Sequence, residues 1–216
     1  MSQPCNLKCD LKKPGEIDAE LSEFWEGNPW LIYEKYNLSC FERNRTYLNV
    51  AGQQFIDISF VTGADNDGDS RSSIAVDVNH DGRLDLLVRQ AGGGPLLLFE
   101  NEFPSGHWLQ VSLRGTKSNR LGIGSRLTAK VGEQTLTREL YPANSYLSQS
   151  PSHVHFGLGA AEGIERLEVK WPSGLVQVFE NLQVDRHLLL EEGRSDVVVV
   201  RPGQRKISAT AKAVQQ

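Results

Sequence analysis

The sequence predicts a mainly β protein in which a propeller-like blade is followed by a small antiparallel β-sandwich, behind a short helical N-terminal extension. Two observations support this prediction. From residue 45 onward, apolar residues recur with the period of two that is typical of strands, and turn residues interrupt them every eight to twelve positions. Before residue 45, the apolar spacing is that of a helix. The predicted segments are 1–44 for the extension, 45–105 for the blade, 106–193 for the sandwich and 194–216 for a tail.

One apolar stripe predicts the helix of the N-terminal extension. Its members are spaced at i, i+4, i+7 and i+8, between Pro14 and the Asn28-Pro29 pair that ends the pattern. They are Ile17, Leu21, Phe24 and Trp25. The same part of the chain holds all three cysteines, and Cys5 and Cys9 have no assigned role because an odd, clustered set supplies no disulfide framework for the rest of the chain.

The blade segment is expected to form short strands separated by Gly-rich or Asp-rich turns. They lie near residues 45–50, 54–60, 72–78, 84–90 and 95–101, a pattern that resembles a four-stranded blade with an extra strand. In the last of these strands, the residues at odd and at even positions are both apolar, which is typical of a strand covered on both faces. No period of 20 to 50 residues recurs, so a complete multi-blade array is not encoded. A lone blade has two open edges, and these offer a route to self-association.

A second alternating set beyond Gly106 predicts the sandwich. Its expected inward-facing residues are Leu109, Val111 and Leu113; Leu127, Ala129 and Val131; Val154, Phe156 and Leu158; Leu167, Val169 and Trp171; and Val176 and Val178. After Gly193 the charged residues are almost all basic, which predicts a solvated and partly disordered tail.

The strongest chemical signal is the sequence DVNHDGRLD at residues 77–85. Side-chain oxygens occupy its positions 1, 3, 5 and 9, the carbonyl of Arg83 is available at position 7, and a glycine at position 6 permits a sharp turn. The four side chains are those of Asp77, Asn79, Asp81 and Asp85. Because a curved loop aims alternate residues inward, and Ca2+ takes six to eight oxygen ligands, these residues predict a strand-loop-strand calcium site.

The loop differs from an EF-hand, since position 12 is Val88 rather than glutamate and both flanks are predicted strands. The alternative interpretation is a solvated Asp-Gly turn that joins two strands. Upstream, Asp65, Asp67 and Asp69 alternate around Gly68. They complete the shell of the same ion, hold a second ion, or form a turn in which the side chains bond their own backbone. These interpretations stay open.

Several motifs resemble known repeats. Residues 77–88, DVNHDGRLDLLV, resemble the calcium-loop core of an FG-GAP or VCBS-type repeat, the blade unit of integrin-like β-propellers. Five later motifs resemble, in order, the ASPIC/UnbV domain that follows FG-GAP repeats in proteins similar to cartilage acidic protein. They are GTKSNR at 115–120, GIGSRL at 122–127, YLSQ at 146–149, HFGLG at 155–159 and WPSG at 171–174. Asn144 departs from the glycine that the family often has before this YLSQ, and one repeat stands where the family has an array.

The resemblance implies a calcium-binding, non-catalytic adhesion or interaction module with a protein or glycan partner, located in an extracellular or periplasmic space. It implies no catalytic residue. The first thirty residues contain no apolar signal-peptide core, so the chain itself does not support export. Two alternatives stay open: an enzyme or enzyme subunit that acts on a glycan or other polar substrate through the ion or the turn at 146–149, and the C-terminal part of a larger β-propeller protein.

Charge and hydropathy argue against two classes of partner. The net charge of −4 does not fit nucleic-acid binding, which needs a basic surface, and no apolar run approaches the roughly 18 residues of a membrane span. The sequence contains neither a G-x-S-x-G elbow nor a phosphate-binding glycine loop. His153 and His155 lie two apart on a predicted strand, where we favour hydrogen bonding over zinc binding because no third ligand has a fixed spacing.

Overall fold

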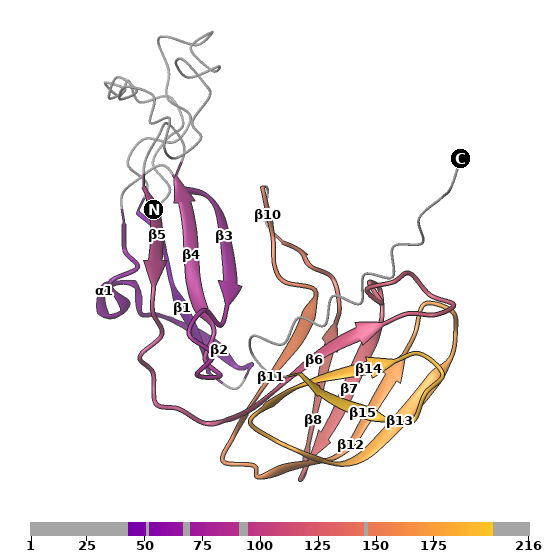
Figure 1. Cartoon of the computed structure of the whole chain (residues 1–216). Helices are drawn as coiled ribbons and strands as arrows, with labels where there is room; N and C mark the ends of the chain where they lie inside the picture. The colour runs from indigo at the N-terminus through magenta and orange to yellow at the C-terminus, as the bar shows by residue number, and fades with distance from the viewer. Residues whose placement is uncertain (1–42, 51, 67–69, 91–94, 145–146, 201–216) are drawn as a thin grey trace, which may run out of the picture. The chain divides into compact units, whose positions relative to one another are not determined.

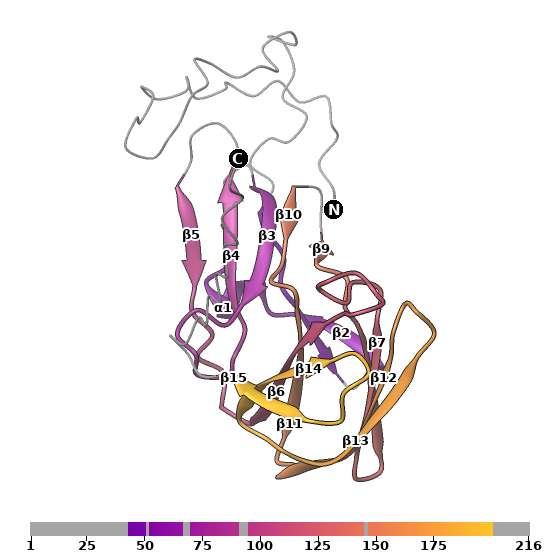
Figure 2. The ribbon, with the colours of Figure 1, turned by 45° about the vertical axis from the view of Figure 1, so that its right-hand side comes forward.

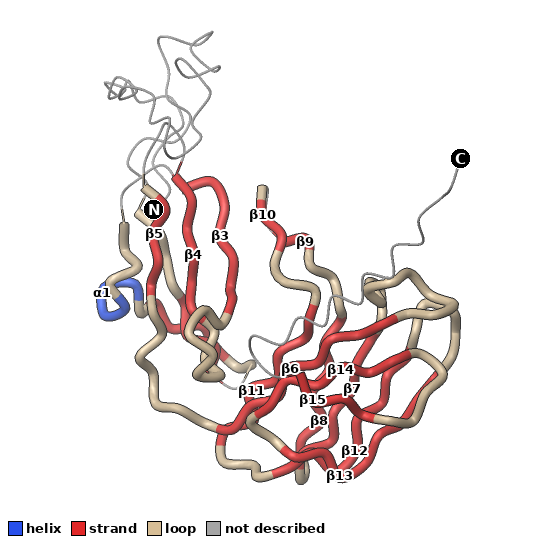
Figure 3. The backbone as a smooth tube through the Cα atoms, in the orientation of Figure 1, coloured by secondary structure: helices blue, strands red, loops and turns tan. Residues whose placement is uncertain are grey.

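A computed structural model of the chain describes residues 43–50, 52–66, 70–90, 95–144 and 147–200 (Figure 1). Strands make up 55% of these residues. The helical content of the described ranges is one turn, α1 (Ser59–Thr62), which is blue in Figure 3. The mainly β class is therefore confirmed, whereas the predicted N-terminal helix lies outside the described residues.

The chain divides into two compact units that interleave in sequence. The first unit takes in the residues up to Val78, Leu84–Glu102 and Ala143–Ser150. The second takes in Asn79–Arg83, Phe103–Pro142 and the residues from Pro151 onward. The tip of the acidic loop therefore belongs to the second unit, and a short segment from the predicted sandwich belongs to the first.

The first unit is built from short antiparallel pairings. β1 (Tyr47–Val50) and β2 (Gln54–Asp57) form a hairpin. β3 (Ser70–Val76), β4 (Asp85–Gln90) and β5 (Leu96–Phe99) form a three-stranded sheet with β4 in the centre. β9 (Ala143–Asn144) and β10 (Ser148–Gln149) pair over two residues each. The five strands expected between residues 45 and 101 thus all form, but in a hairpin and a separate three-stranded sheet.

The second unit contains two four-stranded sheets (Figure 2). One has the order β11-β6-β14-β15, with β11 (His153–Gly159), β6 (His107–Arg114), β14 (Arg186–Glu191) and β15 (Val197–Val200). The other has the order β13-β12-β7-β8, with β13 (Val176–Gln183), β12 (Gly163–Lys170), β7 (Arg126–Val131) and β8 (Gln134–Glu139). The β6–β14 pair is parallel, and the other pairs are antiparallel.

The alternating residues of both sheets share one core, largely as expected. Every predicted inward-facing residue of β6, β11 and β12 that was named above is buried, including Trp171 just beyond β12. The expectation fails in β13, where Val176 and Val178 are 49% and 41% exposed and Phe179 and Leu182 are buried instead. Asn181 has a φ of +54°, so the strand alternation is broken between the two buried residues.

The end of the second unit also differs from the expectation. Residues 197–200, expected to belong to a solvated tail, form β15 and pair with β14 in the register His187↔Val200. Four consecutive β-branched valines suit a strand, and this local preference outweighs the basic composition around them. Residues 201–216 lie outside the described part of the chain.

Candidate functional site

Two buried aspartates of the first unit lie at the base of the acidic loop. Asp77 follows β3 directly, and Asp85 is the first residue of β4. The two carboxylate oxygens of Asp85 accept backbone N–H groups from Val78 and from Asn101, both at 2.9 Å. Asp85 therefore ties the start of the loop to the segment that follows β5.

The tip of the loop holds the other three predicted ligands in one hydrogen-bonded group. Asp81 accepts the backbone N–H of Arg83 at 2.8 Å and the amide of Asn79 at 3.0 Å, and it forms an ion pair with the Arg83 guanidinium. The N–H of Arg83, with these side chains, lowers the pKa of Asp81 despite partial desolvation. His80 and Gly82 have φ values of +63° and +88°, so left-handed residues alternate with the donors and curve the backbone.

The upstream aspartates are described only in part. Asp65 forms an ion pair with Arg43 at 2.8 Å, and its second carboxylate oxygen is buried with no hydrogen-bond partner. Asp67 and Asp69 lie outside the described residues. Across the described ranges, no three His, Cys, Asp or Glu side chains form a cluster arranged to hold a metal ion. The structure therefore does not gather the carboxylates of Asp77, Asp81 and Asp85 into one metal-holding cluster.

The outer face of the β11-β6-β14-β15 sheet gathers histidines. His153 and His155 alternate with the buried Val154 and Phe156, as predicted. The ring of His153 meets the edge of His187 with ring centroids 5.4 Å apart. Burial, together with the charges of His153 and His80, lowers the pKa of His187 to about 4, so this ring is neutral at neutral pH.

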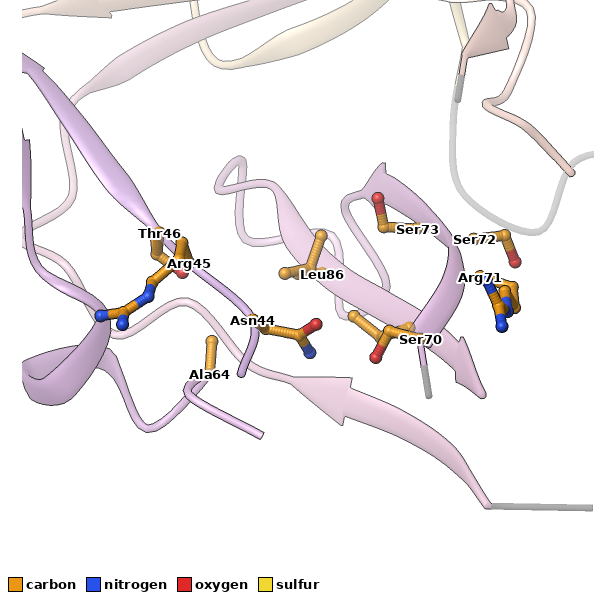
Figure 4. A pocket seen from close by; sticks show the side chains of 10 residues that line it. Asn44, Arg45, Thr46, Ala64, Ser70, Arg71, Ser72, Ser73 and Leu86 are labelled. Carbon is orange, nitrogen blue, oxygen red and sulfur yellow. The ribbon is translucent and has the colours of Figure 1, made fainter. Parts of the chain in front are cut away.

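A small pocket of about 270 Å³ lies in the first unit (Figure 4). Hydroxyl, amide and guanidinium groups share its lining with apolar surface, part of which belongs to Leu86 and Val88 of β4. The polar residues include Asn44, Arg45, Thr46, Ser70, Arg71 and Ser73. The volume lies just below the range of about 300–1000 Å³ that is usual for ligand sites, so only a small molecule would fit.

A buried glutamate explains two of the sequence motifs. Glu192 is 3% exposed, and one carboxylate oxygen accepts the backbone N–H groups of Thr116, Lys117 and Ser118 at 2.7–2.8 Å. The other oxygen accepts the hydroxyls of Ser118 and Ser173. Burial acts to raise the pKa of Glu192, but these bonds outweigh it and lower the pKa to about 2. The GTKSNR and WPSG motifs thus converge on a residue that no local spacing in the sequence identifies.

The GTKSNR and WPSG motifs both lie within a segment that matches a known protein family. The model of the ASPIC and UnbV family matches residues 115–197. Residues 115–197 are an ASPIC/UnbV domain. A comparison with curated proteins found no match. The family match starts after β6, yet β6 pairs with both β11 and β14 of the ASPIC/UnbV domain, so the folded unit begins before the matched sequence.

The ASPIC/UnbV domain also contributes residues to the first unit. Within Ala143–Ser150, the hydroxyl of Ser148 donates to the backbone carbonyl of Ser73 on β3 at 2.8 Å. Part of the YLSQ turn is therefore held by β3, while Tyr146 lies outside the described residues. In the part of the chain that the structure describes, no helix has the length and apolar character that crossing a membrane requires.

Proposed function

We propose that the protein is a calcium-binding, non-catalytic adhesion or interaction module. The observation that supports this most directly is the placement of oxygen donors at alternate residues of the 77–85 loop, with left-handed backbone at His80 and Gly82 between them. The resemblance of residues 77–88 to an FG-GAP or VCBS-type repeat supports the same function, and it favours a location outside the cytoplasm, where calcium is abundant.

The chemistry of the donors fits a calcium ion. Asp77, Asp81 and Asp85 supply carboxylates, Asn79 supplies an amide oxygen and Arg83 supplies a carbonyl, which is the all-oxygen set that Ca2+ prefers. Each Asp85 oxygen accepts one described N–H bond and has a second lone pair. Asp81 is paired with the Arg83 guanidinium, so an ion has to replace that partner.

Calorimetric titration with Ca2+ tests the proposal. We expect a dissociation constant of about 10⁻⁴–10⁻³ M, the range of extracellular calcium modules, and a rise in thermal stability of about 1.4 kcal/mol when calcium is tenfold above the constant. Asp81→Asn should lose most of the affinity, and Asp196→Asn, which changes an exposed aspartate outside the loop, should lose none. A parent protein that shows neither heat nor stabilisation in millimolar calcium contradicts the proposal.

A second candidate is the binding of a glycan or another small polar ligand in the pocket of the first unit. The arginine and hydroxyl groups of its lining support this candidate, because sugars are held by several such hydrogen bonds. Saturation-transfer NMR with a panel of monosaccharides tests it on the parent and on Ser70→Val. Transfer that is equal for both proteins contradicts a site in this pocket.

A further inference from the structure

The β1–β2 hairpin of the first unit exposes large apolar side chains. Phe55 pairs with Asn49, two residues beyond Tyr47, so Tyr47 and Phe55 are diagonal neighbours on one face of the hairpin. Their side chains are 54% and 69% exposed. We call this surface the aromatic face. Because each ring leaves a large apolar area in water, covering the aromatic face would stabilise the hairpin.

The other residues that the structure describes leave this face open. β1 and β2 form a sheet of two strands, and no third strand within the described ranges pairs with either of them. A two-stranded hairpin alone is marginally stable in water. The turn α1 that follows β2 adds apolar exposure rather than cover, since Phe60 and Val61 are 92% and 82% exposed. The hairpin therefore calls for an apolar partner from elsewhere.

One segment of the same chain has the chemistry that such a partner needs. Residues 17–25 carry the apolar stripe of Ile17, Leu21, Phe24 and Trp25 at helical spacing. A helix this short is marginal in water by itself, so its stripe also calls for an apolar surface. Between Pro14 and Pro29 the charged residues are all acidic, which suits the side of an amphipathic helix that faces water. They are Glu16, Asp18, Glu20, Glu23 and Glu26.

The length of chain between the stripe and the hairpin permits a direct contact. Residues 26–42 separate Trp25 from Arg43, where the described chain leads into β1. Fully extended, this tether reaches at most about 60 Å, whereas a strand of four residues is about 13 Å long. A short tether holds the two surfaces at an effective concentration of about 1 mM, so weak docking is sufficient.

We propose that residues 17–25 dock as an amphipathic helix on the aromatic face of the β1–β2 hairpin. The occupant is a segment of the same chain because its tether begins beside the face and because its own two aromatic side chains suit packing against Tyr47 and Phe55. Docking covers the stripe and the aromatic face together. The proposal does not depend on calcium binding.

Amide hydrogen exchange in the full chain tests the contact from the side of the helix. We expect Leu21→Asp, in the centre of the stripe, to speed exchange of the β1 and β2 amides at least about tenfold, the loss of a docked state favoured ten to one. Ala19→Asp is the matched control, since residue 19 lies on the opposite side of the predicted helix. The same carboxylate placed there should leave exchange unchanged.

The reciprocal variants test the contact from the side of the hairpin. Phe55→Asp should speed exchange of the amides of residues 17–25, because the released helix opens. Gln54→Asp is its control, since Gln54 is also exposed but projects from the other face of β2. Slow exchange of the β4 amides in each variant shows that the first unit is intact, and Phe55→Ser replaces Phe55→Asp if the latter does not fold.

The outcomes separate this occupant from other occupants. Faster exchange in Leu21→Asp and Phe55→Asp, with neither control affected, supports docking. Hairpin protection that is equal in the parent and in Leu21→Asp overturns it, and protection that rises with protein concentration then assigns the face to a second copy. Fast hairpin exchange in the parent at every concentration also overturns docking and leaves the face for a separate partner.

Discussion

At the scale of single residues, the most strongly constrained group in the ASPIC/UnbV domain is the carboxylate of Glu192. Five donors from Thr116, Lys117, Ser118 and Ser173 surround it, and all of them lose their acceptor if the carboxylate is removed. A buried donor without an acceptor costs about 1–3 kcal/mol. The side chain therefore fixes two loops that are far apart in sequence.

Glu192→Gln should lower the free energy of unfolding by at least about 2 kcal/mol, because the amide group of glutamine faces N–H donors that need an acceptor. Urea unfolding at pH 7 measures this loss. Glu191→Gln is the matched control, since Glu191 makes more exposed ion pairs with Arg114 and Arg194 that are worth less than about 1 kcal/mol. Equal losses in the two variants would contradict the role given to Glu192.

The same residue predicts a dependence of stability on acid. The pKa of Glu192 is about 2 in the folded protein and near 4.5 without these bonds. Its contribution to stability is therefore complete above about pH 4.5 and is lost as the pH falls toward 2. Thermal unfolding followed across this range should show a steeper decline for the parent than for Glu192→Gln.

His187 predicts a second acid-sensitive range at higher pH. Burial and the nearby His153 and His80 lower its pKa from 6.5 to about 4, so protonation favours the unfolded chain. The stability it contributes is complete above pH 6.5 and is lost as the pH falls from 6.5 to 4. His187→Gln should flatten this part of the profile, as measured by thermal unfolding across the range.

At the scale of elements, the 77–85 loop combines a local pattern of oxygen donors with a contact to Trp108, a residue far along the chain. The alternation of donors is visible in the sequence, as is the need for a glycine in the turn. The indole beneath Gly82 is not, because Trp108 lies 26 residues further along the chain. The one available signal was parity, since Trp108 alternates with the buried Leu109 and so belongs on the outer face of its strand.

In the proposed calcium site, Arg83→Ala should strengthen calcium binding severalfold, because the Arg83 guanidinium occupies the Asp81 carboxylate that the ion would need. The loss of the 3.3 Å bond to Phe103 acts in the opposite direction, but this exposed bond is long and contributes little. Calorimetry on Arg83→Ala and on Arg83→Lys separates charge from shape. Weaker binding in Arg83→Ala than in the parent would show that Arg83 supports the loop rather than competing with calcium.

At the scale of the whole molecule, each compact unit includes a short segment from the sequence range of the other. The tip of the acidic loop is counted with the second unit, and Ala143–Ser150 of the ASPIC/UnbV domain is counted with the first. A boundary drawn along the sequence at residue 105 therefore does not separate the folded units. Sequence periodicity locates strands, but it does not report which segments leave their neighbours to pack elsewhere.

The edge of the three-stranded sheet predicts association between copies of the chain. β5 is an edge strand, and its Leu96 and Leu98 are 61% and 52% exposed, although the sequence suggested a strand covered on both faces. An apolar, uncovered edge favours pairing with another strand. Leu98→Lys should therefore shift sedimentation toward monomer, and Leu175→Lys, in a turn of the second unit, should not. A parent that sediments as a monomer at high concentration contradicts this prediction.

The sequence by itself determined the strands between residues 45 and 101, five strands of the second unit, the parity of most named core residues and the order of oxygen donors around Gly82. These features depend on neighbours a few positions apart, so local alternation and spacing encode them. Only the tertiary structure decided that Glu192 joins two distant motifs, that Trp108 supports the loop tip and that residues 197–200 complete a sheet. Such contacts join residues that lie far apart in the chain, and they are set by strand order and by which faces pack together, neither of which a pattern of period two specifies.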